Sequence, residues 1–118
     1  MKLIEIRTYR LKRGCSEKFE AAFEEGLVVL KGGGMDVVAF GRSDHEQESY
    51  YLIRCFDGRE HLEQQQSVFY SSSVWRDGPR TAIVDCIDDY LNTLLWVSPQ
   101  SVDDLRRSNR SGLLSGKS

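Results

Sequence analysis

The chain has 118 residues, which is enough for one domain with a single hydrophobic core and too few for two. Its 16 basic side chains nearly balance 18 acidic ones, and the net charge of −2 gives no basic excess of the kind that nucleic-acid-binding proteins carry. Charges interrupt every apolar run before it reaches the length of a membrane span, and the N-terminus lacks a signal-peptide core. We therefore expect a cytoplasmic protein with no nucleic-acid partner and no membrane span.

Seven elements are expected in chain order. The predicted ranges are a strand over 2–12, a helix over 16–31, strands over 35–42 and 50–56, a helix over 57–70, a short helix that starts near Pro79, and a strand over 90–97.

The signals for these elements are periodicity and helix ends. Alternation of apolar and polar residues over 2–12 is typical of a strand, whereas residues 16–31 show one apolar stripe at helical spacing. Glycines 32–34 can end this helix, because glycine adopts the left-handed conformation without steric cost. Asp57 is the expected N-cap of the second helix.

The order β-α-β-β-α-β defines an α+β protein of ferredoxin-like class, in which two helices cover one face of a four-stranded antiparallel sheet. We expect this domain to occupy residues 1–98. The composition then turns to serine, aspartate, arginine and glycine, which predicts that residues 99–118 are a flexible or partner-docking C-terminal tail. Residues 102–107 could form one helical turn.

Strand alternation divides the sheet residues into two faces. Because the helices need an apolar floor, Ile4 and Ile6 are expected beneath them, and Glu5, Arg7 and Tyr9 on the opposite face. By the same argument the set Tyr51, Ile53 and Cys55 faces the helices. The helix-free face would then also hold Tyr50, Leu52, Arg54 and Phe56, with Phe40, Arg42, Asn92 and Trp96 as further candidates.

A face with so many large apolar groups is too hydrophobic to remain in water. Two copies packed sheet to sheet would bury it across a two-fold axis and close a barrel, so we expect a homodimer. The buried charges then need partners, and Glu5 with Arg7 or Arg54 is the expected pair.

Two segments carry a family resemblance: EIRTYRLKRG at 5–14 and FYSSSVWRDGPR at 69–80. In this order they resemble the NIPSNAP family, within the wider group of dimeric α/β-barrel proteins, over about residues 1–98. The resemblance implies a ferredoxin-like subunit and a barrel-forming dimer. It implies no agreed catalytic mechanism, because relatives on this fold include cofactor-free monooxygenases, haem-degrading enzymes and lactone isomerases.

Glu5, Arg7 and Tyr9 are the candidate catalytic residues, since a carboxylate, a guanidinium and a phenol on one face could hold an anionic or aromatic ligand. Glu5 could act as a general base if burial raised its pKa. The alternative is an interface ion pair with a tyrosine hydrogen bond. The expected ligand-binding residues are Arg7, Tyr9, Arg54, Trp75, Arg76 and Arg80. Trp75, Arg76 and Arg80 could form a pocket rim with an arginine over the Trp75 ring. The alternative is that Trp75 packs in the core and the two arginines cap a helix or form ion pairs.

No metal site or cofactor is expected. His45 lies in a polar loop and His61 near a helix start, and HEQE at 45–48 lacks the second histidine of a zinc motif. The three cysteines have no CxxC spacing; Cys55 and Cys86 lie in apolar patterns. Cys15 lies near a helix start, where a thiol pKa can be lowered, but no histidine accompanies it.

The sequence leaves three functions open. The first is a dimer that binds a small anionic or aromatic molecule in its barrel, with a cofactor-independent enzyme as its catalytic version. The second is a non-enzymatic protein-interaction module. The third is a haem or metal protein, for which no histidine is obviously placed.

Overall fold

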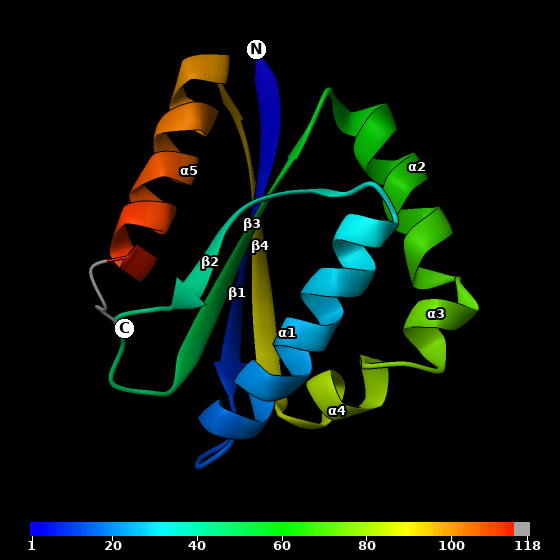
Figure 1. The fold of residues 1–118 in the computed structure, drawn as a ribbon, viewed down its shortest axis with the longest axis vertical. Helices are drawn as coiled ribbons and strands as arrows, with labels where there is room; N and C mark the ends of the chain where they lie inside the picture. Colours follow the sequence, from blue (N-terminus) through cyan, green and yellow to red (C-terminus); the bar gives the residue numbers. More distant parts are fainter. Residues whose placement is uncertain (115–118) are drawn as a thin grey trace.

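The computed structural model describes residues 1–114 of the chain, with side chains up to Asn109. Its four strands form one antiparallel sheet in the order β2-β3-β1-β4, which confirms the predicted ferredoxin-like class. The elements, labelled in Figure 1, are β1 (Lys2–Leu11), α1 (Ser16–Gly32), β2 (Asp36–Arg42), β3 (Ser49–Phe56), α2 (Arg59–Tyr70), α3 (Ser73–Arg76), α4 (Arg80–Asp85), β4 (Ile87–Val97) and α5 (Pro99–Leu114).

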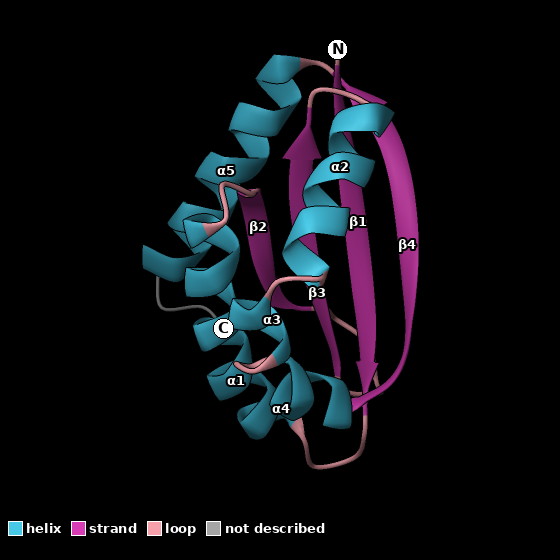
Figure 2. Cartoon of the chain, turned by 90° about the vertical axis from the view of Figure 1, so that its right-hand side faces the viewer, coloured by secondary structure: helices cyan, strands magenta, loops and turns pink. Residues whose placement is uncertain are grey.

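Helices lie on both sides of the sheet. Figure 1 shows α1 to α4 on one side of the strands and α5 on the other, along β2. Edge strand β4 is left uncovered over most of its length, and in Figure 2 it runs along the right-hand side of the sheet, away from α1 and α5. None of the helices in the described residues combines the length and the apolar character needed to cross a membrane.

The main core lies between α1 and the sheet. The apolar stripe of α1 contributes Phe19, Phe23, Leu27 and Leu30, as its spacing predicts. The Phe19 ring packs tilted against Tyr9 of β1 with 5.4 Å between ring centroids, and the Phe23 ring packs edge-on with 6.4 Å. These aromatic contacts add directional interactions to the hydrophobic burial. Helix α1 ends within the predicted glycine segment, at Gly32. Of the three glycines only Gly34 adopts the left-handed conformation, with a φ of +83° in the turn before β2.

The predicted assignment of the two sheet faces is wrong. Tyr9 and Leu52 lie in the core with α1, and Phe56 packs against Leu62 of α2. The whole set that contains Glu5, Arg7 and Arg54 therefore faces α1 and α2, and the set that contains Ile4 lies on the other side. The sets themselves are right, because alternation defines them, but both sets are hydrophobic enough to be buried, so alternation did not decide which one the helices cover.

Helix α5 is the reason for the reversal. Residues 99–118 were expected to be a tail with one turn of helix, but Pro99–Leu114 form a helix of 16 residues. Its Val102 is buried in a cluster with Ile4, Ile53 and Cys55. Its Arg106 donates a hydrogen bond to the Val37 carbonyl on the free edge of β2. The apolar face is thus covered by the chain's own C-terminal helix. The division at residue 98 stays a prediction, and residues 115–118 lie outside the described part.

The start of α2 also differs from its prediction. The N-cap is Gly58, not Asp57. The Asp57 carboxylate instead accepts a hydrogen bond from the Lys2 ammonium, across 55 residues of sequence. An ion pair with the neighbouring strand therefore replaces the capping interaction that the local sequence favours.

Substitution Val102→Asp should destabilise the fold by roughly 3 kcal/mol, because it buries an unpaired carboxylate against Ile4 and Ile53. Urea unfolding followed by circular dichroism measures the effect. The matched control is Ser108→Asp, on an exposed position of the same helix, which should change the unfolding free energy by less than about 0.5 kcal/mol. Equal effects of the two variants would show that α5 does not stabilise the sheet.

Candidate functional site

A buried ion pair lies beneath the helices at the centre of the sheet. Glu5 and Arg54 are directly opposite each other on β1 and β3, and their exposed fractions are 1% and 0%. The Arg54 Nε donates to Glu5 Oε1 at 2.8 Å, and Nη2 donates to the same oxygen. Such a pair is tolerated in a core only when further hydrogen bonds satisfy both groups.

Those further contacts come from two other elements and from Arg7 on the same strand. Gln66 of α2 donates to Glu5 Oε2 at 3.0 Å, and Asn92 of β4 donates to it at 3.2 Å. Arg7 Nη2 lies 3.6 Å from the same oxygen. Both oxygens of the Glu5 carboxylate are therefore engaged by protein groups. This arrangement suits a carboxylate that positions its neighbours and does not favour one that accepts a proton from a ligand.

Arg7 is held from several sides. Its Nε donates to Asn92 Oδ1 at 2.8 Å, its Nη1 donates to the Tyr70 hydroxyl at 3.4 Å, and its guanidinium lies 4.9 Å from the centre of the Tyr90 ring. Burial lowers the pKa of Arg7, but the neighbouring phenols and Glu5 more than offset this, so its pKa is raised and it stays a cation. One carboxylate between two guanidiniums leaves one positive charge uncompensated.

Arg7 forms part of the wall of a cavity of about 480 Å³ between the sheet and helices α2 to α4, a size that suits a small organic molecule. The second cation in its wall is Arg80, and in the described part of the chain no side chain pairs with it. Among the described residues, none that lines this cavity is acidic. The lining consists of Arg7, Tyr9, Gln66, Tyr70, Trp75, Arg80, Ile83, Val84, Ile87 and Tyr90.

Tyr70, at the end of α2, links the ion pair to the cavity. Its hydroxyl oxygen accepts hydrogen bonds from Arg54 Nη1 at 2.8 Å and from Arg7 Nη1 at 3.4 Å. A phenol has two acceptor positions and one proton. With both acceptor positions taken by arginines, the O–H is available as a donor toward a molecule in the cavity.

The aromatic wall is built by the short helices that follow α2. Ser72 caps α3 and accepts from the Trp75 backbone N–H at 3.4 Å. This turn places the Trp75 ring 5.4 Å from Phe69 and 5.5 Å from Tyr70, between ring centres. Pro79 then precedes α4, which begins at Arg80. The local sequence thus delivers an aromatic ring and a cation to the same cavity.

Four of the predicted binding residues come together: Arg7, Tyr9, Trp75 and Arg80 all line the cavity. Glu5 and Arg54 lie behind the lining, and Arg76 is exposed and does not contribute to it. The residues that the sequence analysis missed are Gln66, Tyr70, Ile83, Val84, Ile87 and Tyr90. Tyr70 stands inside the segment that carries the family resemblance, and this was the one available signal for it.

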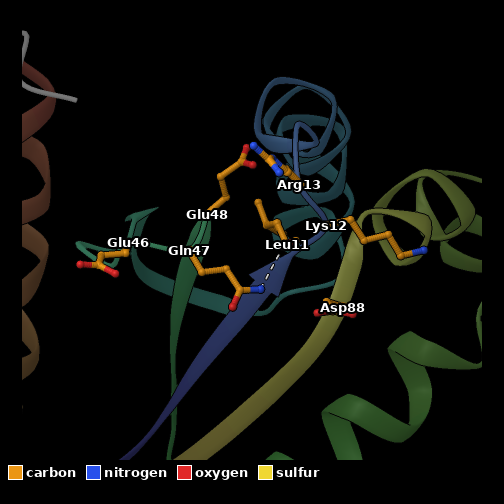
Figure 3. Close-up of a pocket in the computed structure, with 7 residues that line it drawn as sticks. All are labelled: Leu11, Lys12, Arg13, Glu46, Gln47, Glu48 and Asp88. Atoms are coloured by element: carbon orange, nitrogen blue, oxygen red, sulfur yellow. Dashed lines mark hydrogen bonds between the residues drawn. The ribbon is translucent and has the colours of Figure 1, made fainter.

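A second cavity lies where the loop between β2 and β3 meets the end of β1. Figure 3 shows its seven lining residues, with Gln47 donating a hydrogen bond to the Leu11 carbonyl. Of the three acidic residues in its lining, Glu48 accepts hydrogen bonds from the Ser16 hydroxyl and from the backbone N–H groups of Gly14 and Ser16, the two backbone bonds at 2.6 Å and 3.2 Å. The bond from the Ser16 hydroxyl, followed by the bond from the Gly14 N–H, lowers the pKa of Glu48, and together these bonds hold the start of α1. We interpret this cavity as a structural joint.

The two histidines have local partners. His45 shares a hydrogen bond with Ser43 in the loop, and His61 accepts from the Asp57 backbone N–H at 2.9 Å. Among the described residues no group of three or more histidine, cysteine or acidic side chains is arranged to hold a metal ion.

Comparisons with known proteins identify the fold. No family model and no curated protein sequence matches the chain. Among solved structures, a NIPSNAP domain protein from Burkholderia xenovorans has 22% sequence identity and a TM-score of 0.72, and covers 82% of this chain and 95% of its own. A NIPSNAP family protein of unknown function from Agrobacterium tumefaciens has 23% identity and a TM-score of 0.75, with coverages of 83% and 92%.

A more distant likeness is to a cofactor-independent oxygenase from Streptomyces nogalater, at 11% identity, a TM-score of 0.58, and coverages of 82% and 93%. The predicted resemblance to NIPSNAP proteins is confirmed at the level of the fold. At these identities the likeness carries no activity over to this chain.

Substitution Glu5→Gln should reduce the unfolding free energy by roughly 3–5 kcal/mol, because Arg54 would remain buried without a counter-charge. Urea unfolding measures the loss. The double variant Glu5→Leu with Arg54→Met should recover much of it, since an apolar pair needs no counter-charge. As a control, Asp89→Asn in the exposed pair with Arg10 should leave the unfolding midpoint unchanged. A midpoint shift for Asp89→Asn as large as that for Glu5→Gln would contradict the assignment.

The protein should lose stability between about pH 10 and pH 12. Burial raises the pKa of Tyr9 to about 12, although Arg7 partly opposes this. The unfolded chain loses this proton near pH 10, so the native state binds more protons above that pH and stability falls as pH rises. Below pH 10 the contribution is fully present. Tyr9→Phe should flatten the fall in thermal midpoint over this range, and an unchanged slope would contradict the burial of a neutral phenol.

Proposed function

We propose that this chain is a NIPSNAP-like protein that binds a small aromatic anion in the cavity between its sheet and helices α2 to α4, and that it does so as a homodimer. One observation carries the ligand class. Two arginines and four aromatic rings line one cavity of about 480 Å³ that has no acidic residue in its wall. A negative charge and a flat apolar body are the complements of this lining.

The anionic end of the ligand would lie at Arg7 and Tyr70. Arg7 is already oriented by Asn92 and Glu5, so little conformational entropy is lost when it engages a ligand. The Tyr70 O–H supplies a neutral donor beside the cation. A guanidinium and a hydroxyl pointing into the same space suit the two oxygens of a carboxylate. Arg80, at the exposed start of α4, attracts the anion toward the cavity.

The ring of the ligand would pack among Tyr9, Trp75 and Tyr90. Ile83 and Ile87 close the apolar side of the cavity. Any chemistry on the ligand would start from Tyr70, because it is the lining phenol whose hydroxyl oxygen accepts hydrogen bonds from both Arg7 and Arg54. The Glu5 carboxylate serves instead to hold Arg7 and Arg54. No cofactor enters this proposal.

The binding test uses 2-naphthoate, with neutral 2-naphthamide as its uncharged counterpart. We expect 2-naphthoate to raise the thermal midpoint and to quench tryptophan fluorescence through Trp75. The amide should bind at least tenfold more weakly, because it lacks the charge-assisted bond to Arg7. Equal binding of the two compounds, or no binding of either, would refute the proposed ligand class.

Arginine variants locate the site. Arg80→Met should weaken 2-naphthoate binding by roughly 2–5-fold, because it removes the attraction of an exposed cation in the cavity wall and no direct hydrogen bond. The matched control is Arg76→Met, four residues away, exposed and outside the cavity lining, which should leave the affinity unchanged. Both variants change surface residues and should fold, as circular dichroism can verify.

The homodimer proposal rests on strand β4. The patch first expected to require a partner is mostly buried by the chain's own helices, but β4 remains an unpaired sheet edge with apolar side chains on both faces. Leu91 and Trp96 have exposed fractions of 71% and 52%, and Tyr90, Leu94 and Leu95 are exposed as well. Proteins rarely leave such an edge in water. A second copy offers the same surface, which makes a self-complementary two-fold interface.

Light scattering tests the dimer. The wild-type chain should elute at twice its monomer mass at micromolar concentration, whereas Leu91→Asp with Leu95→Asp should elute as a folded monomer. The control is Val28→Asp on α1, which is equally exposed at 72% but lies far from β4 in the fold, and it should remain a dimer. A monomeric wild type would refute the dimer and leave the binding test unaffected.

A further inference from the structure

Two cysteines that are far apart in the sequence meet at the junction of α1 and α4. Cys15 is the N-cap of α1 and Cys86 is the C-cap of α4, and both line one cavity of about 510 Å³. Cys86 is part of the main core, and Cys15 packs against the same core. Both thiols are free. The proposed ligand cavity does not include either of them.

The backbone holds the two residues together. The Lys12 N–H donates to the Cys86 carbonyl at 2.9 Å, and the Cys15 N–H donates to the Lys12 carbonyl at 3.1 Å. Gly14 and Ser16, the residues on either side of Cys15, donate their backbone N–H groups to the Glu48 carboxylate. A hydrogen-bonded turn therefore connects the two cysteines and limits the distance between them in the folded state.

We propose that Cys15 and Cys86 are a redox-active pair that forms a reversible disulfide when the protein meets a hydroperoxide. The Cys15 thiolate attacks hydrogen peroxide, and its sulfur takes one oxygen to become a sulfenic acid while hydroxide leaves. The Cys86 sulfur then attacks the Cys15 sulfur and displaces that oxygen. The thiol protons end in two molecules of water, and each cysteine sulfur has given up one electron.

The surroundings assign the two roles. Cys15 is half-buried and reachable from solvent, with the Lys18 ammonium in the wall of the same cavity, and these features favour attack there. Cys86 is buried, and burial together with Cys15 raises the pKa of its thiol, which suits the second, resolving partner. Cys55 lies on the other side of the sheet in the cluster with Val102, so it has no part in this pair.

The disulfide would act on the fold through α4. This helix contributes Arg80, Ile83 and Val84 to the ligand cavity, and Ile83 already packs closely against α1 at Gly26. A covalent bond from the end of α4 to the start of α1 would fix that wall in place. It would also close a long loop of the chain, which lowers the entropy of the unfolded state.

The experiment treats the full chain with hydrogen peroxide and reads intact mass and peptide maps. We expect a mass loss of two hydrogen atoms, a peptide cross-link between Cys15 and Cys86, and full reversal by a phosphine reductant. The thermal midpoint of the oxidised protein should rise by roughly 5–15 °C. Cys55→Ser should behave as the wild type, whereas Cys15→Ser and Cys86→Ser should each form no internal cross-link.

Two outcomes would overturn the pair. One is oxidation of Cys15 to sulfinic acid with no cross-link, which would mean that Cys86 cannot reach it. The other is a cross-link that also forms, at the same rate, in protein unfolded by urea, which would mean that the fold does not align the thiols. Neither readout involves a ligand, so failure here and failure of the proposed binding function are separate results.

Discussion

The Glu5 carboxylate, buried among two guanidiniums and two amides, is the interaction on which the rest of the structure depends. It connects β1 to β3 through Arg54, to α2 through Gln66 and to β4 through Asn92. A charge at this depth is stable only with all of these partners in place. The same network orients Arg7 and occupies the acceptor positions of Tyr70, so the interaction that closes the core also shapes the cavity beside it.

This constraint explains how a sheet with charges on one face can be buried on both sides. The face with Glu5 and Arg54 is covered by α1 and α2 because these two charges neutralise each other, and the face with Ile4 and Ile53 is covered by α5 because it is apolar. The surface left for a partner is β4, an edge strand of the described sheet that is exposed along most of its length. The surface proposed for the dimer is therefore an edge with its flanks, and no longer a whole sheet face.

The candidate site was predicted in part, and each success or failure has a physical reason. Arg7 and Tyr9 share a face because strand alternation requires it, and Trp75 and Arg80 follow a helix end that turns back toward the sheet. Arg76 was included because an arginine beside Trp75 could form a pocket rim through a cation–π contact, but its position on the short α3 leaves it exposed. Tyr70 was missed because its importance lies in bonds to Arg7 and Arg54, which are distant in the chain.

By itself the sequence determined the order of the four strands with α1 and α2 between them, the periodicity of α1 and the membership of each strand face, because these follow from local spacing and backbone preference. Only the tertiary structure decided which face the helices cover, that residues 99–114 form a helix on the sheet, and which of the three cysteines meet. These outcomes depend on competition between two surfaces that could both be buried. Which surface faces α1 and α2 depends on the pairing of charges between strands and on whether α5 covers the other surface. Neither of these leaves a local pattern in the sequence.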